Sequence, residues 1–120
     1  MKLIGLRLSN VMRPEDYAAF DGWQDDPLTR IWNVWGYIDG RDGAQAVRLA
    51  LESGITGFER FIIASPDTVM TRPNAELLAE VFPDVEVRGE IGEHTTLLSI
   101  DKARQLLGYD PQHSWRDEVQ

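Results

Sequence analysis

Residues 60–64 have the sequence Arg-Phe-Ile-Ile-Ala, and the apolar run that follows Arg60 decides the fold class. A strand covered on both faces of a parallel sheet is apolar throughout, whereas a strand with one wet face alternates. Residues 3–8, Leu-Ile-Gly-Leu-Arg-Leu, form a second such run with one charge, at Arg7. A helical apolar stripe separates the two runs and consists of Ala44, Val47, Ala50 and Leu51. The pattern predicts an α/β fold with short parallel strands and crossover helices.

Capping residues predict where the other elements begin. Asp26 before Pro27 indicates a helix start, because a carboxylate caps free N–H groups and proline suits the first helical position. Thr71 is the expected cap of a helix ending before Pro83, and Ser99 that of a helix closed by Gly108. The remaining expected elements are a short helix from Pro14, a strand at Tyr37-Ile38, a helix from Asp42 to a stop at Gly54, an edge strand over 85–88 and a last helix after Ser114.

Composition narrows the possible partners. The 120 residues include 12 basic and 20 acidic side chains, which gives a formal net charge of −8. Such a chain is poorly suited to bind nucleic acid or an anionic membrane surface. The absence of cysteine excludes disulfides, thiolate catalysis and cysteine-zinc sites. No stretch approaches the roughly 20 apolar residues of a membrane span. We expect residues 1–120 to form a single cytoplasmic domain without a signal peptide.

No complete active site is evident from the residues themselves. The histidines, His94 and His113, are isolated from one another, and the spacing of Asp39, Asp42 and His94 predicts no metal site. The glycines near residue 40 lack the order of a dinucleotide-binding loop, and no nucleophile elbow is present. Catalytic residues are therefore not assigned.

Arginines beside the predicted strands are the stronger candidates for a binding site. Arg7, Arg41 and Arg88 each lie in or next to a strand, where a guanidinium can clamp a diphosphate. The alternative is an internal salt bridge with one of the many acids. Asn10 follows the first strand at a carboxyl end, where α/β sheets bind ligands, although a turn is the simpler explanation.

Three blocks of sequence resemble one protein family. Residues 5–11, Gly-Leu-Arg-Leu-Ser-Asn-Val, resemble the "LRxxNVYGP" strand and loop of the extended short-chain dehydrogenase/reductases, the NAD-dependent epimerase/dehydratase family. Residues 37–46 resemble that family's "YVDVRDVAxA", and residues 99–111 its "SxxKARxLLGYxP" tail. The blocks occur in the family's order and span nearly the whole chain. Met12-Arg13, Gly40 and Gly43 depart from the motifs.

The resemblance covers only the C-terminal, substrate-binding portion of that family. It implies an incomplete Rossmann-like fold from which the N-terminal dinucleotide-binding half is absent. NAD(P) is implied by the family, but its glycine-rich loop is missing here. The Tyr-x-x-x-Lys pair is missing as well, because neither Lys2 nor Lys102 has a tyrosine four residues before it.

The resemblance also implies roles for individual residues. Asn10 and Arg88 would approach a nucleotide-sugar, which is the family's substrate class. Leu8 and Ser9 would lie at the nicotinamide edge of the cofactor. Asp42 would cap and pair at the start of a helix rather than bind ligand.

Three hypotheses for the function remain open. The chain is a nucleotide-sugar epimerase/dehydratase fragment that is inactive alone, a stand-alone nucleotide-sugar-binding module, or a self-associating structural module. Two strands without their usual neighbours would leave apolar surface exposed. We therefore expect a homo-oligomer, or a missing Rossmann half, to cover residues 3–8, residues 60–64 or the region of Trp23, Trp32 and Trp35.

Overall fold

Two parallel strands form the longer of two small sheets. In the computed structural model, which describes residues 1–118, β1 (Lys2–Leu8) pairs with β4 (Gly57–Ile63). The register runs from Lys2 opposite Gly57 to Leu8 opposite Ile63. Both expected strands and their parallel pairing are confirmed.

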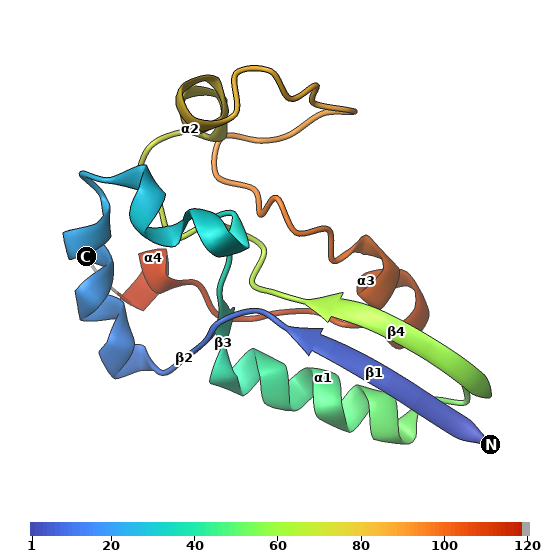
Figure 1. Cartoon of the computed structure of the whole chain (residues 1–120). Helices are drawn as coiled ribbons and strands as arrows, with labels where there is room; N and C mark the ends of the chain where they lie inside the picture. Colours follow the sequence, from blue (N-terminus) through green and yellow to red (C-terminus); the bar gives the residue numbers. More distant parts are fainter. Residues whose placement is uncertain (119–120) are drawn as a thin grey trace.

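The second sheet lies just beyond the carboxyl end of β1. It consists of β2 (Val11–Met12) and β3 (Ile38–Asp39), which are also parallel. The helix α1 (Gly40–Glu52) follows β3 directly and runs alongside β1 (Figure 1). The Asp39 carboxylate caps this helix by accepting the Arg41 N–H at 2.9 Å. The helix therefore begins two residues before the predicted start.

Short 3-10 helices connect β2 to β3. η1 (Pro14–Trp23) and η2 (Pro27–Asn33) each begin at a proline. The predicted cap of η2 is confirmed, because the Asp26 carboxylate accepts the Leu28 N–H at 3.0 Å.

Three further helices complete the chain as described. They are α2 (Asn74–Val81), α3 (Asp101–Leu107) and α4 (Trp115–Glu118). Gly108 ends α3 with a φ of 73°, in the left-handed region that favours glycine, as predicted. Two other predicted caps are wrong. Pro73 occupies the cap position of α2 while Thr71 hydrogen-bonds to Gln24, and Ile100, not Ser99, occupies the cap position of α3. Helix α1 ends at Glu52, and the predicted stop, Gly54, directly follows its C-cap Ser53.

The predicted edge strand over residues 85–88 is not formed. This segment belongs to a long connection between α2 and α3 that extends away from the sheets (Figure 1). Val85 and Val87 alternate as a strand would, yet their side chains are 58% and 45% exposed. No strand of the described chain pairs with them, and Gly89, with a φ of 79°, turns the chain just beyond. An alternating pattern without a partner does not produce a strand.

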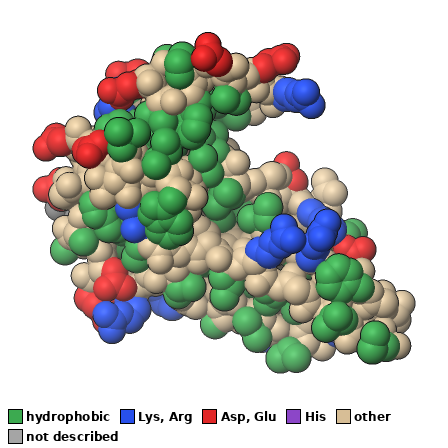
Figure 2. Space-filling view, viewed as in Figure 1, with side chains coloured by type: hydrophobic (Ala, Val, Ile, Leu, Met, Phe, Trp, Pro, Cys, Tyr) green, Lys and Arg blue, Asp and Glu red, His purple; other side chains and the backbone are tan. Residues whose placement is uncertain are grey.

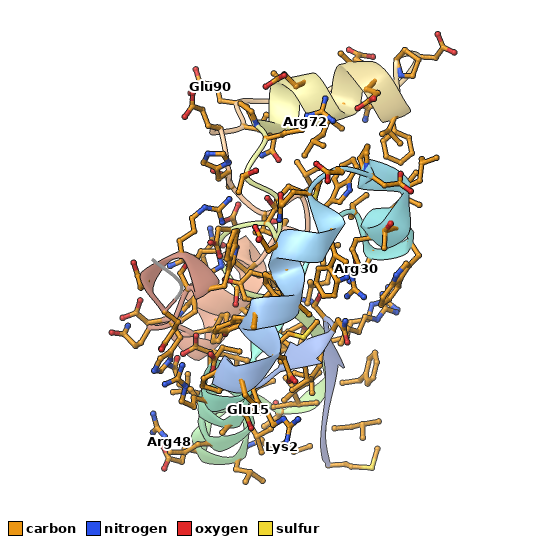
Figure 3. The ribbon with its side chains drawn as sticks, turned by 90° about the vertical axis from the view of Figure 1, so that its left-hand side faces the viewer. Lys2, Glu15, Arg30, Arg48, Arg72 and Glu90 are labelled. Atoms are coloured by element: carbon orange, nitrogen blue, oxygen red, sulfur yellow. The ribbon has the colours of Figure 1, made fainter. Side chains whose placement is uncertain are left out.

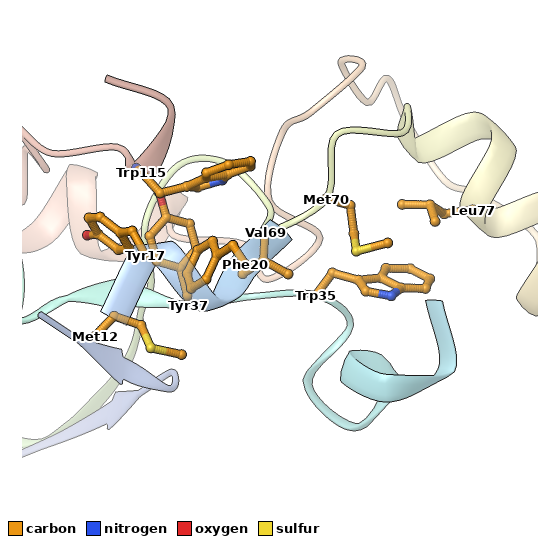
Figure 4. Close-up of a cluster of buried hydrophobic side chains, with 9 residues drawn as sticks. All are labelled: Met12, Tyr17, Phe20, Trp35, Tyr37, Val69, Met70, Leu77 and Trp115. Carbon is orange, nitrogen blue, oxygen red and sulfur yellow. The ribbon is translucent and has the colours of Figure 1, made fainter. Parts of the chain in front are cut away.

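The core consists of two apolar clusters. Figure 4 shows the first, in which Tyr17, Phe20, Tyr37 and Trp115 gather on one side of Val69, and Trp35, Met70 and Leu77 on the other. The second cluster lies between the β1–β4 sheet and helices α1 and α3. Its buried members are Ile38, Ala46, Phe61, Ile63, Ala64, Ile100, Ala103, Leu107 and Tyr109.

One face of the β1–β4 sheet is open to solvent. Ile4 and Leu6 pack against the second cluster, but Leu3 and Phe58, which are opposite each other in the register, are 53% and 59% exposed. No described element packs on this side, so apolar surface is exposed there, as expected for two strands without their usual neighbours. None of the helices in this part of the chain has the length and apolar character needed to span a membrane.

Candidate functional site

A cleft of about 360 Å³ opens beyond the carboxyl end of β4. We call it the arginine cleft and define it by Arg88, Thr95, Thr96, Ser99, Asp101 and Arg104, which line it together with Pro66 and four neighbours. Figure 2 shows a notch on this side of the molecule with basic side chains at both of its rims. The arginine cleft thus occupies the position at which parallel sheets commonly receive ligands.

Backbone hydrogen bonds hold the outer wall of the cleft. Thr96 N–H donates to the Pro66 carbonyl at 2.9 Å, and Thr95 forms an isolated bridge with Asp67. The fully buried Asn74 at the start of α2 supports the same wall, since its Nδ2 donates to the carbonyls of Gly92 at 3.0 Å and Thr95 at 2.7 Å. The wall is therefore anchored by a side chain outside the cleft.

Two arginines and two acidic residues are the charged side chains that line the cleft. Arg88 comes from the connection before α3 and Arg104 from α3 itself. Neither guanidinium forms an ion pair within residues 1–118, although nine such pairs occur there. Glu90 and Asp101 also line the cleft, so it offers hydrogen-bond acceptors as well as cations.

A smaller cavity beside the cleft carries three more basic side chains. It measures about 250 Å³ and shares Ser99 with the arginine cleft. Arg7, Arg60 and Lys102 line it. Gly5 is opposite Arg60 in the register, so Arg7 and Arg60 lie on the same face of the sheet, two residues apart along the strands. Lys102 is partly neutralised by Glu59, whose carboxylate lies 2.6 Å from its Nζ.

The other residues singled out from the sequence lie at the end of β1, away from the arginine cleft. Asn10 contributes its carbonyl to the sheet by accepting the Ile38 N–H at 2.9 Å. Ser9 donates its N–H to Ile63, while its Oγ is hidden from solvent without a hydrogen-bond partner. Leu8 is 45% exposed. Of the four expected binding residues, only Arg88 lines the cleft.

Gly36 allows the end of β1 to approach the segment that leads to the cleft. A Cβ at this position would lie 2.6 Å from Leu98 Cδ1 and 3.2 Å from Ser9 Oγ, so any larger residue would overlap the leucine. Leu98 directly precedes Ser99, which lines both cavities. The unpartnered hydroxyl of Ser9 thus lies near Leu98 but does not line the arginine cleft.

Arg41 forms an internal salt bridge, the alternative that the sequence left open. Its guanidinium contacts the buried Asp39 carboxylate and Glu118, each at 2.9 Å. Burial by itself raises the pKa of Asp39, but hydrogen bonds from Arg41 and the Tyr17 hydroxyl outweigh burial and lower that pKa to about 2. Arg41 is therefore used in structure rather than in ligand binding.

The buried Asp42 holds the C-terminal segment. Its carboxylate accepts the N–H groups of Gln112 at 2.9 Å and His113 at 3.0 Å, and contacts the His113 ring at 3.0 Å. Asp42 therefore forms a pair with His113, as the resemblance implies, but it lies within the first turn of α1 and is not the cap of that helix. His94 does not join it. No group of three or more potential ligands is placed to hold a metal ion in the described part of the chain.

Three basic residues near the cleft were not predicted from the sequence. Arg60 and Arg104 lie inside a predicted strand and helix, where they resemble ordinary exposed positions, and Lys102 was considered only as a missing catalytic lysine. The register that brings Arg60 beside Arg7 depends on where β4 begins, which sequence periodicity does not fix.

Comparison with protein-family models, with curated proteins and with solved structures finds no match. The interpretation of the cleft therefore depends on its own geometry and chemistry.

Proposed function

We propose that this chain is the substrate-binding portion of an NAD-dependent epimerase/dehydratase-type protein, with an incomplete Rossmann-like fold, and that its arginine cleft binds the diphosphate of a nucleotide-sugar. The observation that carries this proposal is the pair of guanidinium groups, Arg88 and Arg104, that line one cavity without an ion pair among residues 1–118. Guanidinium groups bind phosphate oxygens in bidentate fashion, which makes arginine well suited to a diphosphate.

The size and lining of the cleft support a ligand of this class. Its volume of about 360 Å³ falls in the range of small-molecule pockets. Hydroxyl groups of Thr95 and Ser99, together with the Asp101 carboxylate, offer acceptors and donors for sugar hydroxyls. The basic cavity of Arg7, Arg60 and Lys102 adds positive potential at one end. An anion with a polar, uncharged extension matches this arrangement.

The residues present do not fit a dinucleotide. The family places NAD(P) on a glycine-rich loop at a helix N-terminus, and this sequence has no such loop. Helix α1 follows a strand directly, but the Arg41 N–H in its first turn donates to the Asp39 carboxylate, which would repel a pyrophosphate. We therefore assign no NAD(P) site to residues 1–118 and expect no hydride transfer by this chain alone.

Calorimetric titration of the purified chain tests the proposal. UDP-glucose and dTDP-glucose should bind, whereas glucose alone should not, because the diphosphate supplies the contact. Arg88→Gln and Arg104→Gln should each weaken binding about tenfold, while Arg48→Gln on the exposed face of α1 should not change it. Absence of binding at millimolar nucleotide-sugar, or equal affinity in all three variants, would contradict the proposal.

A second candidate function is self-association, and the open face of the β1–β4 sheet favours it. Leu3 and Phe58 expose apolar surface on adjacent strands, and β1 has no partner on its other edge within residues 1–118. A second copy of the chain, or a separate Rossmann half, would cover both features. Arg7 and Arg60 lie on the same face of the sheet as Leu3 and Phe58, so a partner on that face would also reach the basic cavity. The residues that define the arginine cleft lie outside both strands.

A further inference from the structure

Arg30 of η2 lies against two indole rings. Its guanidinium carbon lies 4.3 Å from the centre of the Trp23 ring and 4.8 Å from that of Trp32. A cation over the face of a tryptophan is attracted by the ring's electron density. Figure 3 labels this arginine on its 3-10 helix, and neither it nor the tryptophans line the arginine cleft. The arrangement is therefore separate from the proposed function.

One edge of this guanidinium has no hydrogen-bond partner. Nε and Nη2 of Arg30 are hidden from solvent, and no acceptor contacts them in the described residues. The nearby Asp26 carboxylate already caps η2 through Leu28. Burial lowers the pKa of Arg30, since no acid compensates for its loss of water. Hidden charged donors without acceptors are rare in folded proteins and require an explanation.

The backbone around Arg30 is strained. Arg30 itself has non-helical dihedrals that kink η2, and Val34 and Trp35 both have left-handed φ values, 46° and 62°. A left-handed conformation is unfavourable for a β-branched residue such as valine. The buried Trp35 holds the segment in place, because its Nε1 donates to the Pro27 carbonyl at 2.8 Å. Strain of this kind is concentrated at sites that bind ligands.

The two tryptophans differ in how firmly they are held. Trp23 stacks on the buried Phe20 ring, with centroids 4.8 Å apart. Trp32 is 66% exposed and makes no aromatic pair in the part of the chain that the structure describes. Trp23 is therefore held in place beside the guanidinium. Trp32 can rotate away from it, because little of its surface is buried and little burial would be lost.

We propose that Trp32 is a movable cover and that the Nε–Nη2 edge of Arg30, once uncovered, binds the carboxylate or phosphate group of a small anionic ligand. This edge presents two parallel N–H groups, which match two oxygens of either anion. The indole of Trp23 beneath it favours a ligand with an apolar or ring-shaped part next to its charge. The bound anion would supply the acceptors that Arg30 lacks.

Tryptophan fluorescence can detect this binding, because two indoles contact the guanidinium. Titration with sodium phosphate and with sodium acetate should produce a saturable change that sodium chloride of equal ionic strength does not. The anion that acts at lower concentration identifies the group preferred. Arg30→Met keeps the apolar stem and should weaken binding about tenfold or more, whereas Arg48→Met, on exposed α1, should not.

The Trp32→Ala substitution tests the role of Trp32 as a cover independently of the binding edge of Arg30. Removing this exposed ring should leave the fold intact and should tighten anion binding, because the edge no longer has to be uncovered. Weaker binding in Trp32→Ala would contradict the cover. An unchanged response in folded Arg30→Met, or no saturable response in the wild type, would contradict the site. Should Arg30→Met fail to fold, Trp32→Ala still decides. Arg88→Gln reports on the arginine cleft separately, so the two proposals can fail independently.

Discussion

At the scale of single residues, buried carboxylates hold the chain together more than they offer chemistry. Asp39 accepts hydrogen bonds from Tyr17 and from the backbone and side chain of Arg41. Asp42 does the same for the segment that follows α3. Both carboxylates are less than 2% exposed, so their partners replace the water they lost on folding. These acids therefore have structural roles and leave the arginines as the binding groups.

The lowered pKa of Asp39 predicts a pH-dependent stability. Its pKa is about 2 in the folded state, against an ordinary value of 3.8, so its contribution is complete above about pH 5 and is lost as pH falls through 2. At neutral pH the contribution is about 2.5 kcal/mol. The free energy of unfolding, measured with denaturant, should be lower for Asp39→Asn than for the wild type at pH 7. That difference should shrink between about pH 5 and pH 2, and a difference independent of pH would contradict the assignment.

At the scale of elements, the ends of helices and the anchors of loops decide where the cleft residues lie. Helix α3 supplies Arg104, and Gly108 stops it at the required residue. The wall that carries Thr95 depends on α2, because Asn74 binds two of its carbonyls. Helix α2 thus supports the cleft without lining it, whereas α3 contributes two lining residues.

Gly108→Ala should destabilise the protein by about 1 kcal/mol, since alanine resists a left-handed φ. Neither Gly108 nor Gly54 has an atom within 4 Å of an added Cβ, and Gly54 has no such φ. Gly54→Ala is therefore the matched control and should be neutral or slightly stabilising. Thermal unfolding of the two variants measures the difference, and equal melting temperatures would show that backbone conformation does not limit position 108.

Asn74→Asp should loosen the cleft wall without creating a cavity. Aspartate has the shape of asparagine but does not donate to the carbonyls of Gly92 and Thr95, and its charge would be buried beside them. We expect faster amide exchange at Thr96 and weaker nucleotide-sugar binding. Exchange at Leu49, in helix α1, should change less and serves as the internal control, because no residue of α1 lines the cleft. Uniform loss of protection would instead indicate global destabilisation.

At the scale of the whole molecule, the sheet is only half covered. Helices α1 and α3 bury one face, and the other exposes Leu3 and Phe58. The predicted contribution of the tryptophans to an interface is limited, because Trp35 is fully buried and only Trp32 is largely exposed. The open face of the sheet is therefore the better candidate for self-association.

Phe58→Glu should convert an associating chain to a monomer, because a carboxylate on the open face would be buried in the interface. Sedimentation velocity of the wild type should show dimers or larger species. Leu106→Glu is a suitable control, since this residue is similarly exposed but lies on α3. A wild type that sediments only as a monomer would contradict self-association.

Local patterns were enough to predict the elements whose causes are local. The apolar runs at 3–8 and 60–64, the Asp26 cap and the Gly108 stop depend on neighbouring residues, and all are confirmed. The alternation over 85–88 failed because a strand also needs a partner, which lies far away in sequence or is absent.

The sequence by itself determined an α/β chain with parallel strands, and it marked Arg88 as a candidate for binding. Only the tertiary structure decided that Arg88 and Arg104 share a cleft, that Arg41 pairs internally, and that Asn10 lies elsewhere. The physical reason is the distance along the chain over which each interaction acts. Backbone preferences and burial periodicity act over a few residues, whereas a binding site requires charges that strand register and helix docking bring together across the chain.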